Sequence, residues 1–181
     1  LNLSLRTEEG RIVGTAVHGW LEHIARDGVA NWSVERLSTI QSRLQAFMLA
    51  NGVPRQRTDI CVGRALKALE NCLRSTRGRW ILAEHLDAAC ELALTGVIDG
   101  LPVHAVIDRT FIDENGERWV IDYKTSEPGD GEGVEDFLNR ERERYRPQLM
   151  DYKMLTTLQN QQSTVRTALY FPLNDAWCEV V

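Results

Sequence analysis

The spacing of apolar residues divides the chain into a helical first part and a strand-rich second part. Up to about residue 75, apolar side chains recur every three or four positions, the period of an amphipathic helix. This pattern predicts a helix over residues 14–26, stopped by Gly28, and a second helix from an N-cap at Ser33 to Asn51-Gly52. A third helix is predicted over about residues 59–75. Its inward face is expected to carry Ile60, Ala65, Leu66, Leu69 and Leu73.

After residue 75 the pattern changes to short apolar runs separated by turn residues. The runs predict strands over residues 80–83, 89–97, 103–112, 118–123, 164–171 and 177–181. A turn at residues 98–102 and the Asn115-Gly116 hairpin signal join three of these strands into an antiparallel meander. Residues 126–133 read S-E-P-G-D-G-E-G, which is typical of a loop. A helical region follows from Val134 to about Gln161, and Pro147 is predicted to begin a new helix within it.

This order of elements predicts an α/β fold, with a central mixed β-sheet flanked by helices and a helical N-terminal portion. A chain of 181 residues suits a single domain. We expect residues 1–75 to form its mainly helical part and residues 76–181 its sheet core. The chain begins at Leu1 rather than Met, so we expect a domain excised from a longer protein or one whose first residues are missing.

Composition narrows the class of protein. Hydrophobic residues make up 43% of the chain and charged residues 26%, as in soluble globular proteins. No apolar run approaches the roughly 20 residues that cross a bilayer, and no signal peptide is visible, so we expect a cytoplasmic protein with no membrane partner. The net charge of -5 excludes nucleic-acid binding by bulk positive charge. If the chain binds DNA, a local basic patch and metal ions must provide the attraction.

The four cysteines, Cys61, Cys72, Cys90 and Cys178, fit no zinc-binding spacing and contain no C-x-x-C pair. The clustered spacing of iron–sulfur ligands is absent as well, so no iron–sulfur cluster is expected. Buried free thiols in a reducing compartment are the favoured interpretation.

The candidate chemistry lies between residues 106 and 125. Asp108 and Asp122 each follow an apolar β-like run, and Lys124 shares a strand face with Asp122 because strand residues i and i+2 point the same way. Two carboxylates beside a lysine can hold Mg²⁺ or Mn²⁺ for phosphodiester hydrolysis, with the Tyr123 backbone carbonyl as a further ligand. The competing interpretation is a salt-bridged strand end. Asp99 has a similar G-V-I-D context, but Asp99-Gly100 resembles a turn, so we favour Asp108.

Other candidates lie on flanking segments. His18, on the first predicted helix, can complete a metal site through an imidazole nitrogen. Glu91 either points at the site or is solvated. Gln148 and Tyr152, one helical turn apart, can contact phosphate or DNA, or form ordinary helix surface. Arg144 belongs to the stretch N-R-E-R-E-R-Y-R, which is either a salt-bridged helix or a phosphate-contacting segment.

Five short segments, in this order, carry a family resemblance. They are G-T-A-V-H-G-W-L-E from Gly14, E-L-A-L from Glu91, A-V-I-D-R from Ala105, I-D-Y-K-T from Ile121 and Q-L-M-D-Y from Gln148. Together they resemble the nuclease domain of the RecB family, within the PD-(D/E)XK group of restriction-endonuclease-like folds. Ala105 departs from the glycine that the family often has before its I-D pair.

The resemblance implies roles for these residues. His18, Asp108 and Asp122 would bind metal, Lys124 would be catalytic, and Gln148 and Tyr152 would shape the site. It also implies a context, the C-terminal nuclease domain of a UvrD-like helicase in a RecBCD- or AddAB-type complex with a partner subunit. We therefore expect a Mg²⁺- or Mn²⁺-dependent DNA exonuclease that acts on single-stranded ends in double-strand break repair and recombination. The alternative is a non-catalytic DNA-binding or docking module of a repair complex. No G-x-x-x-x-G-K-[ST] loop is present, so this chain is not itself expected to be an ATPase.

Overall fold

The computed structural model describes residues 3–159 and 164–180, which fall into two compact units. The first unit comprises the chain up to Ala83 with Lys124–Ser126 and Pro172–Asp175, and the second comprises the remaining segments. The first is mainly helical and the second is built on a five-stranded mixed sheet, so the predicted α/β class with a helical N-terminal portion is confirmed. Within the described ranges, no helix has the length and apolar character of a membrane span.

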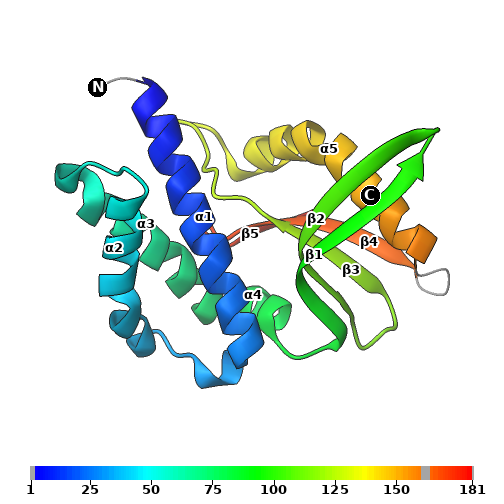
Figure 1. Cartoon of the computed structure of the whole chain (residues 1–181), viewed down its shortest axis with the longest axis horizontal. Coiled ribbons are helices and arrows are strands. Elements are labelled where there is room, and N and C mark those ends of the chain that lie inside the picture. The colour runs from blue at the N-terminus through cyan, green and yellow to red at the C-terminus, as the bar shows by residue number, and fades with distance from the viewer. Residues whose placement is uncertain (1–2, 160–163, 181) are drawn as a thin grey trace. The chain divides into compact units, whose positions relative to one another are not determined.

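Four α-helices dominate the first unit (Figure 1). They are α1 (Leu3–Asp27), α2 (Gln41–Ala50), α3 (Arg55–Arg74) and α4 (Thr76–Leu82), with 3-10 turns at Val29–Asn31 and Glu35–Ile40. Helix α3 contacts each of the other three. Buried residues recur along α3 at helical spacing and form its inward face. They include Cys61, Val62, Ala65, Ala68, Leu69, Cys72 and Leu73. The core of this unit therefore forms around α3.

Several predicted helix boundaries in this unit were wrong. Helix α1 begins at Leu3 rather than at residue 14, because Ile12 and Val13 are buried and outweigh the helix-weakening effect of Gly10. The Ser33 hydroxyl accepts a hydrogen bond from the Arg36 backbone N–H at 3.3 Å, as a cap would, but the turn it precedes is 3-10. Ile60 is 49% exposed rather than inward-facing, since it falls beside the buried stripe of α3.

The predicted strand over residues 80–83 is also wrong, because residues 80–82 belong to α4 and Ala83 is its C-cap. A short apolar run cannot distinguish a strand from a buried helix by its periodicity. The deciding feature is local: the Ser75 hydroxyl accepts a hydrogen bond from the Gly78 backbone N–H at 3.0 Å and caps the helix. Ile81 and Leu82 are then buried on its inner face.

At Gly78, α4 comes close to the backbone at the end of α3. A Cβ atom at this position would lie 2.3 Å from the Cys72 carbonyl oxygen, so Gly78→Ala is expected to destabilise the fold by about 1–3 kcal/mol or more. Gly63→Ala is the matched control, because a Cβ there meets nothing within 4 Å and should stabilise α3 by up to about 1 kcal/mol. Urea unfolding of both variants measures the difference. Equal stability of the two would contradict the close approach.

The second unit is built on one sheet with the strand order β1-β2-β3-β4-β5. The strands are β1 (Leu86–Ile98), β2 (Leu101–Ile112), β3 (Arg118–Tyr123), β4 (Val165–Phe171) and β5 (Ala176–Glu179). Only the β3–β4 pair is parallel. The meander β1-β2-β3 is as predicted, and the Asp99-Gly100 turn has positive φ at both residues, as a tight hairpin requires. The predicted strand end at Val181 lies outside the described residues.

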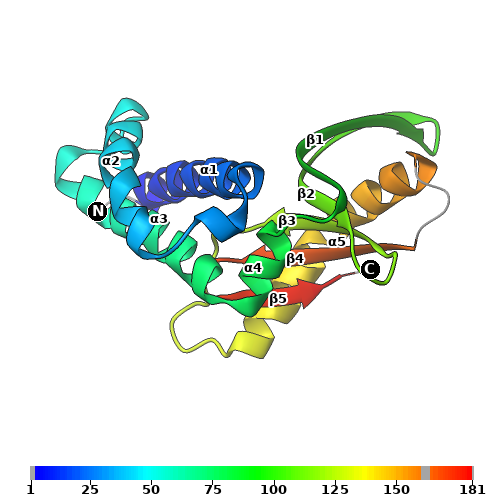
Figure 2. The ribbon, with the colours of Figure 1, turned by 90° about the horizontal axis from the view of Figure 1, so that it is seen from below.

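Helix α5 (Val134–Gln159) packs along the sheet. Phe137 and Leu149 join a buried cluster with β4 and β5, while Leu155 joins a second cluster with β1, β2, β3 and β4. Figure 2 shows the long β1–β2 hairpin curving over the end of this helix. The prediction that Pro147 begins a new helix was wrong, because Pro147 lies inside α5. Residues of α5 on both sides of the proline are buried against the same sheet. This burial offsets the helix hydrogen bond that proline, which has no backbone N–H, cannot donate. The predicted helix end near Gln161 lies outside the described residues.

Candidate metal centre

Asp108 lies on β2 beside the point where β2 and β3 stop pairing through their backbones. The last paired residues are Arg109 and Ile121. Beyond them, the Asp108 Oδ2 accepts a hydrogen bond from the Tyr123 backbone N–H at 2.7 Å. The Asp108 side chain therefore accepts the hydrogen bond that a backbone carbonyl would accept in a paired strand, and it connects β2 to the end of β3. This bond is buried, with Asp108 only 9% exposed, so the carboxylate has a fixed position next to the Asp122-Tyr123 dipeptide.

Glu91 lies on β1, the strand beside β2, and has an unusual backbone. Its neighbours Cys90 and Leu92 pair with Arg109 and Ile107, so Glu91 lies opposite Asp108. Glu91 has φ +50°, a conformation that costs a non-glycine residue free energy and that clusters at functional sites. One carboxylate oxygen of Glu91 and one of Asp108 lie within 4.8 Å of each other. The sequence left the direction of Glu91 open, and the structure brings it to Asp108.

Asp122 and Lys124 lie at the end of β3, the central strand of the sheet. Asp122 is 4% exposed and Lys124 half-buried. β3 ends at Tyr123, so Lys124 follows the strand instead of lying on it. The prediction that Lys124 shares a strand face with Asp122 therefore does not hold. A buried carboxylate costs free energy unless it is paired or binds a metal. Asp99, the rival aspartate, is exposed in the β1–β2 turn.

His18 belongs to the first unit, on α1, and the short segment Lys124–Ser126 belongs to the same unit. A Cβ atom at Gly14, one helical turn before His18, would lie 3.0 Å from the Thr125 Oγ1. The glycine therefore lets α1 approach the residue that follows Lys124. Glu22, one turn after His18 on α1, forms an ion pair with Arg26 at 2.7 Å.

Gln148 and Tyr152 are half-buried on α5 and contact each other. The Gln148 Nε2 donates a hydrogen bond to the Tyr152 hydroxyl at 2.6 Å, as their spacing of one helical turn allows. The Tyr152 ring packs against both buried clusters of the second unit, so its hydroxyl and the amide of Gln148 are held in place.

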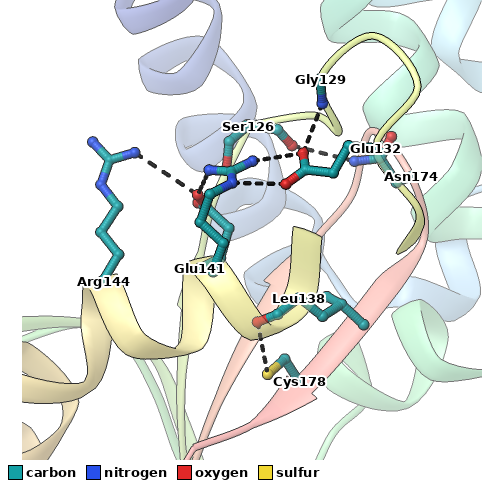
Figure 3. Close-up of polar contacts among 9 residues, drawn as sticks. Ser126, Gly129, Glu132, Leu138, Glu141, Arg144, Asn174 and Cys178 are labelled. Atoms are coloured by element: carbon teal, nitrogen blue, oxygen red, sulfur yellow. Dashed lines mark hydrogen bonds and ion pairs between the residues drawn. The ribbon is translucent and has the colours of Figure 1, made fainter. Parts of the chain in front are cut away.

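The arginine-rich stretch is extensively salt-bridged, and Figure 3 draws the pairs around Glu132 and Glu141. Arg140 binds both oxygens of Glu132 at 2.8 and 2.9 Å and also contacts Glu141, which is fully buried. Arg146 pairs with Glu143 at 2.7 Å. Arg144 lies 3.8 Å from the Glu141 carboxylate and its side chain is 62% exposed. These pairs match the salt-bridged interpretation for most of the stretch and leave Arg144 the most accessible cation in it.

The Glu132–Arg140 pair should be visible in a pH titration. The Arg140 guanidinium, with the Gly129 backbone N–H, lowers the pKa of Glu132 to about 2 from 4.5. The pKa of Glu132 is lower in the folded protein than in the unfolded chain. The stabilisation of the fold by the ionised Glu132 is therefore complete above about pH 4.5 and is lost as the pH falls towards 2. Carboxyl-carbon NMR should give the low midpoint for Glu132 in the wild type and a higher one in Arg140→Gln, where the Gly129 N–H bond remains. Glu143, paired with Arg146, is the control that should not move.

The donor atoms suit a hard divalent cation. Carboxylate oxygens are the ligands that Mg²⁺ and similar ions prefer, at about 2.0–2.6 Å, so two oxygens on opposite sides of one ion lie about 4–5 Å apart. The Asp108 and Glu91 oxygens lie within 4.8 Å of each other, close enough to share one ion. Asp122 is a buried carboxylate on the next strand, outside this pair. Sequence reasoning gave Glu91 no clear role, because a positive φ at a glutamate leaves no trace in the residue pattern.

A mixed sheet with buried aspartates on two neighbouring strands, the second followed by a lysine, defines a restriction-endonuclease-like nuclease core. A comparison with protein families agrees: the PD-(D/E)XK nuclease superfamily matches residues 2–177. The chain belongs to this superfamily, whose members are generally metal-dependent nucleases or phosphodiesterases. A search of curated proteins found no match. Family membership indicates that this chain is a metal-dependent nuclease.

Proposed function

We propose that the chain is a RecB- or AddA-like exonuclease domain that hydrolyses DNA phosphodiester bonds with Mg²⁺ or Mn²⁺. The observation that carries this proposal is the pair of carboxylates on β1 and β2. Asp108 accepts a hydrogen bond from the Tyr123 N–H, and a Glu91 carboxylate oxygen lies within 4.8 Å of an Asp108 oxygen. Asp122 and Lys124, at the end of the next strand, supply the remaining parts of a D-x-K site.

Each residue has a role in this proposal. A bound divalent cation would supply a Lewis acid and would lower the pKa of a bound water. Asp108 and Asp122 would hold that cation, with His18, Glu91 and the Tyr123 carbonyl as further ligands. Lys124 stabilises the negative charge that develops on the phosphate and orients the attacking water. Gln148 and Tyr152 contact the substrate phosphate, and Arg144 provides an accessible cation for the DNA backbone.

The assignment of His18 is supported from within the first unit. Gly14 and His18 are one turn apart and so share a face of α1. Since Gly14 approaches Thr125, this face of the helix is turned towards the segment that begins with Lys124. A histidine there would add a nitrogen ligand to an otherwise oxygen-rich site.

The proposed biological context rests on the resemblance of the five segments, in their order, to the RecB family. We propose that the domain works with the helicase portion of a longer polypeptide and a partner subunit, as in RecBCD- and AddAB-type complexes. Its substrate would be the single-stranded ends that a helicase produces during double-strand break repair and recombination. A domain with net charge -5 gains from such delivery, because its own field does not attract DNA.

Linear and circular single-stranded DNA of the same sequence test the exonuclease proposal. With Mg²⁺, the protein should degrade the linear strand to short products and leave the circle intact, and blunt duplex DNA should be cut more slowly than single strands. Cleavage of the circle at the rate of the linear strand would overturn the exonuclease assignment. DNA binding without cleavage of any strand, in Mg²⁺ or Mn²⁺, would favour the non-catalytic module.

A further inference from the structure

A hollow between α1 and α2 has no role in the proposed cleavage site. Its volume is about 350 Å³, within the range of small-molecule sites. The lining residues all belong to the first unit and come from these two helices. They are Thr15, Ala16, Gly19, Trp20, His23, Arg43 and Phe47.

The lining combines flat aromatic surface with a positive charge. Trp20 and Phe47 are half-buried, so each presents part of its ring, while His23 and Arg43 are exposed at the rim. In the part of the chain that the structure describes, Arg43 forms no ion pair. Aromatic rings beside an uncommitted guanidinium suit a ligand with a flat π-system and a negative charge. A nucleotide unit, with its base and its phosphate, has both.

The aromatic wall is held in place by its neighbours. Trp20, His23 and Trp32 pack edge-to-face, with ring centroids 5.2–6.0 Å apart. Trp32 is itself fixed, because its Nε1 donates a hydrogen bond to Asp27 at 2.7 Å and the Arg36 guanidinium lies 4.1 Å from its ring centroid. A preorganised ring loses little entropy when a base stacks on it.

The aromatic wall of the hollow and His18 lie on different faces of α1. At 100° per residue, Trp20 and His23 point about 160° and 140° away from His18, whereas Thr15, at the edge of the hollow, lies about 60° from it. A base in the hollow is therefore not the nucleotide being cleaved. A strand bound there would reach the other face only by crossing a helix about 10–12 Å wide, so the hollow would act as an anchor away from the scissile bond.

We propose that this hollow binds one nucleotide unit of single-stranded DNA, with the base stacked on Trp20 and Phe47 and a phosphate at Arg43. The proposal rests on the proposed nuclease function and deepens it by naming a substrate subsite. Base–aromatic stacking is tolerant of sequence, which suits an enzyme that degrades a strand without regard to its bases. Stacking also contributes binding free energy that does not depend on the overall charge of the domain.

The test measures binding without cleavage, by fluorescence anisotropy of a fluorescein-labelled oligothymidylate in EDTA. Trp20→Ala should weaken binding about 5- to 150-fold, and Trp20→Phe should restore most of the loss. Arg43→Ala should reduce the slope of log affinity against log salt by about 0.7, the value for one phosphate contact on a single strand. Arg74→Ala, an exposed arginine paired with Glu70 on α3, is the charge-matched control and should leave the slope unchanged.

The outcomes separate this proposal from the nuclease assignment. Unchanged affinity in Trp20→Ala and an unchanged salt slope in Arg43→Ala, with both variants folded by circular dichroism, would overturn the subsite even if the wild type cleaves DNA. If Trp20→Ala fails to fold, the Arg43→Ala slope still decides, because Arg43 is exposed. Loss of binding in both variants with no cleavage by the wild type would keep the subsite and overturn only the nuclease. Binding of an acidic aromatic peptide that oligothymidylate does not displace would assign the hollow to a protein partner and overturn the proposal.

Discussion

Asp122→Asn is expected to lower the rate of DNA cleavage by at least about 10²–10³-fold while the protein stays folded. Asparagine has nearly the same shape as aspartate but no negative charge, so it cannot hold a divalent cation against water. Single-turnover cleavage of an end-labelled single strand in Mg²⁺ measures the rate, and urea unfolding in EDTA measures the stability.

Asp99→Asn is the matched control for this substitution. Asp99 follows the same Val-Ile pair as Asp108 and Asp122, but it lies exposed in the β1–β2 turn. Asparagine tolerates the positive φ of that turn at least as well as aspartate. Cleavage by Asp99→Asn should equal that of the wild type. A large loss in Asp99→Asn together with normal cleavage by Asp122→Asn would mean that the wrong aspartate has been assigned.

At Asp108, two substitutions should separate chemistry from structure. Both Asp108→Asn and Asp108→Ala remove the charge, and both are expected to abolish most cleavage. Only alanine also removes the acceptor for the buried Tyr123 N–H, which the Asp108 Oδ2 binds at 2.7 Å. An unsatisfied buried donor costs about 1–3 kcal/mol, so Asp108→Ala should unfold at lower urea than Asp108→Asn by about that amount.

Urea unfolding in EDTA makes this comparison free of any metal contribution. Equal stabilities for Asp108→Ala and Asp108→Asn would show that the bond between Asp108 and the end of β3 does not support the sheet. Normal cleavage by Asp108→Asn would remove Asp108 from the site, whatever the stabilities. Either result would require a different arrangement of β2 and β3 from the one described above.

The sheet was the most predictable part of the fold. Its hairpins carry strong local signals: Asp99-Gly100 and Asn115-Gly116 fix tight turns, and alternating apolar runs on either side fix the strands. Helix boundaries were less predictable because helix caps and tertiary burial decided them. Trp80 and its neighbours form a helix through the Ser75 cap, and α5 continues through Pro147 because both of its halves pack on one sheet.

The site shows the same limit. The sequence indicated Asp108, Asp122 and Lys124 because aspartates follow apolar runs at a spacing that a hairpin brings together. It left Glu91 open, since the positive φ that turns this residue towards Asp108 is a property of the folded backbone. The hollow beside Trp20 was also invisible, because its residues come from two helices whose packing the pattern does not specify. Local chemistry was readable from the residues, whereas its tertiary partners were not.

A crystal of the protein grown or soaked with Mn²⁺ tests the central claim most directly. Anomalous scattering locates the ion without assumptions about the ligands. The proposal predicts an ion bound by Asp108 and Asp122, with His18 and Glu91 in contact with it and Lys124 beside it. An ion bound elsewhere, or none at Mn²⁺ concentrations that support cleavage, would contradict the proposed site.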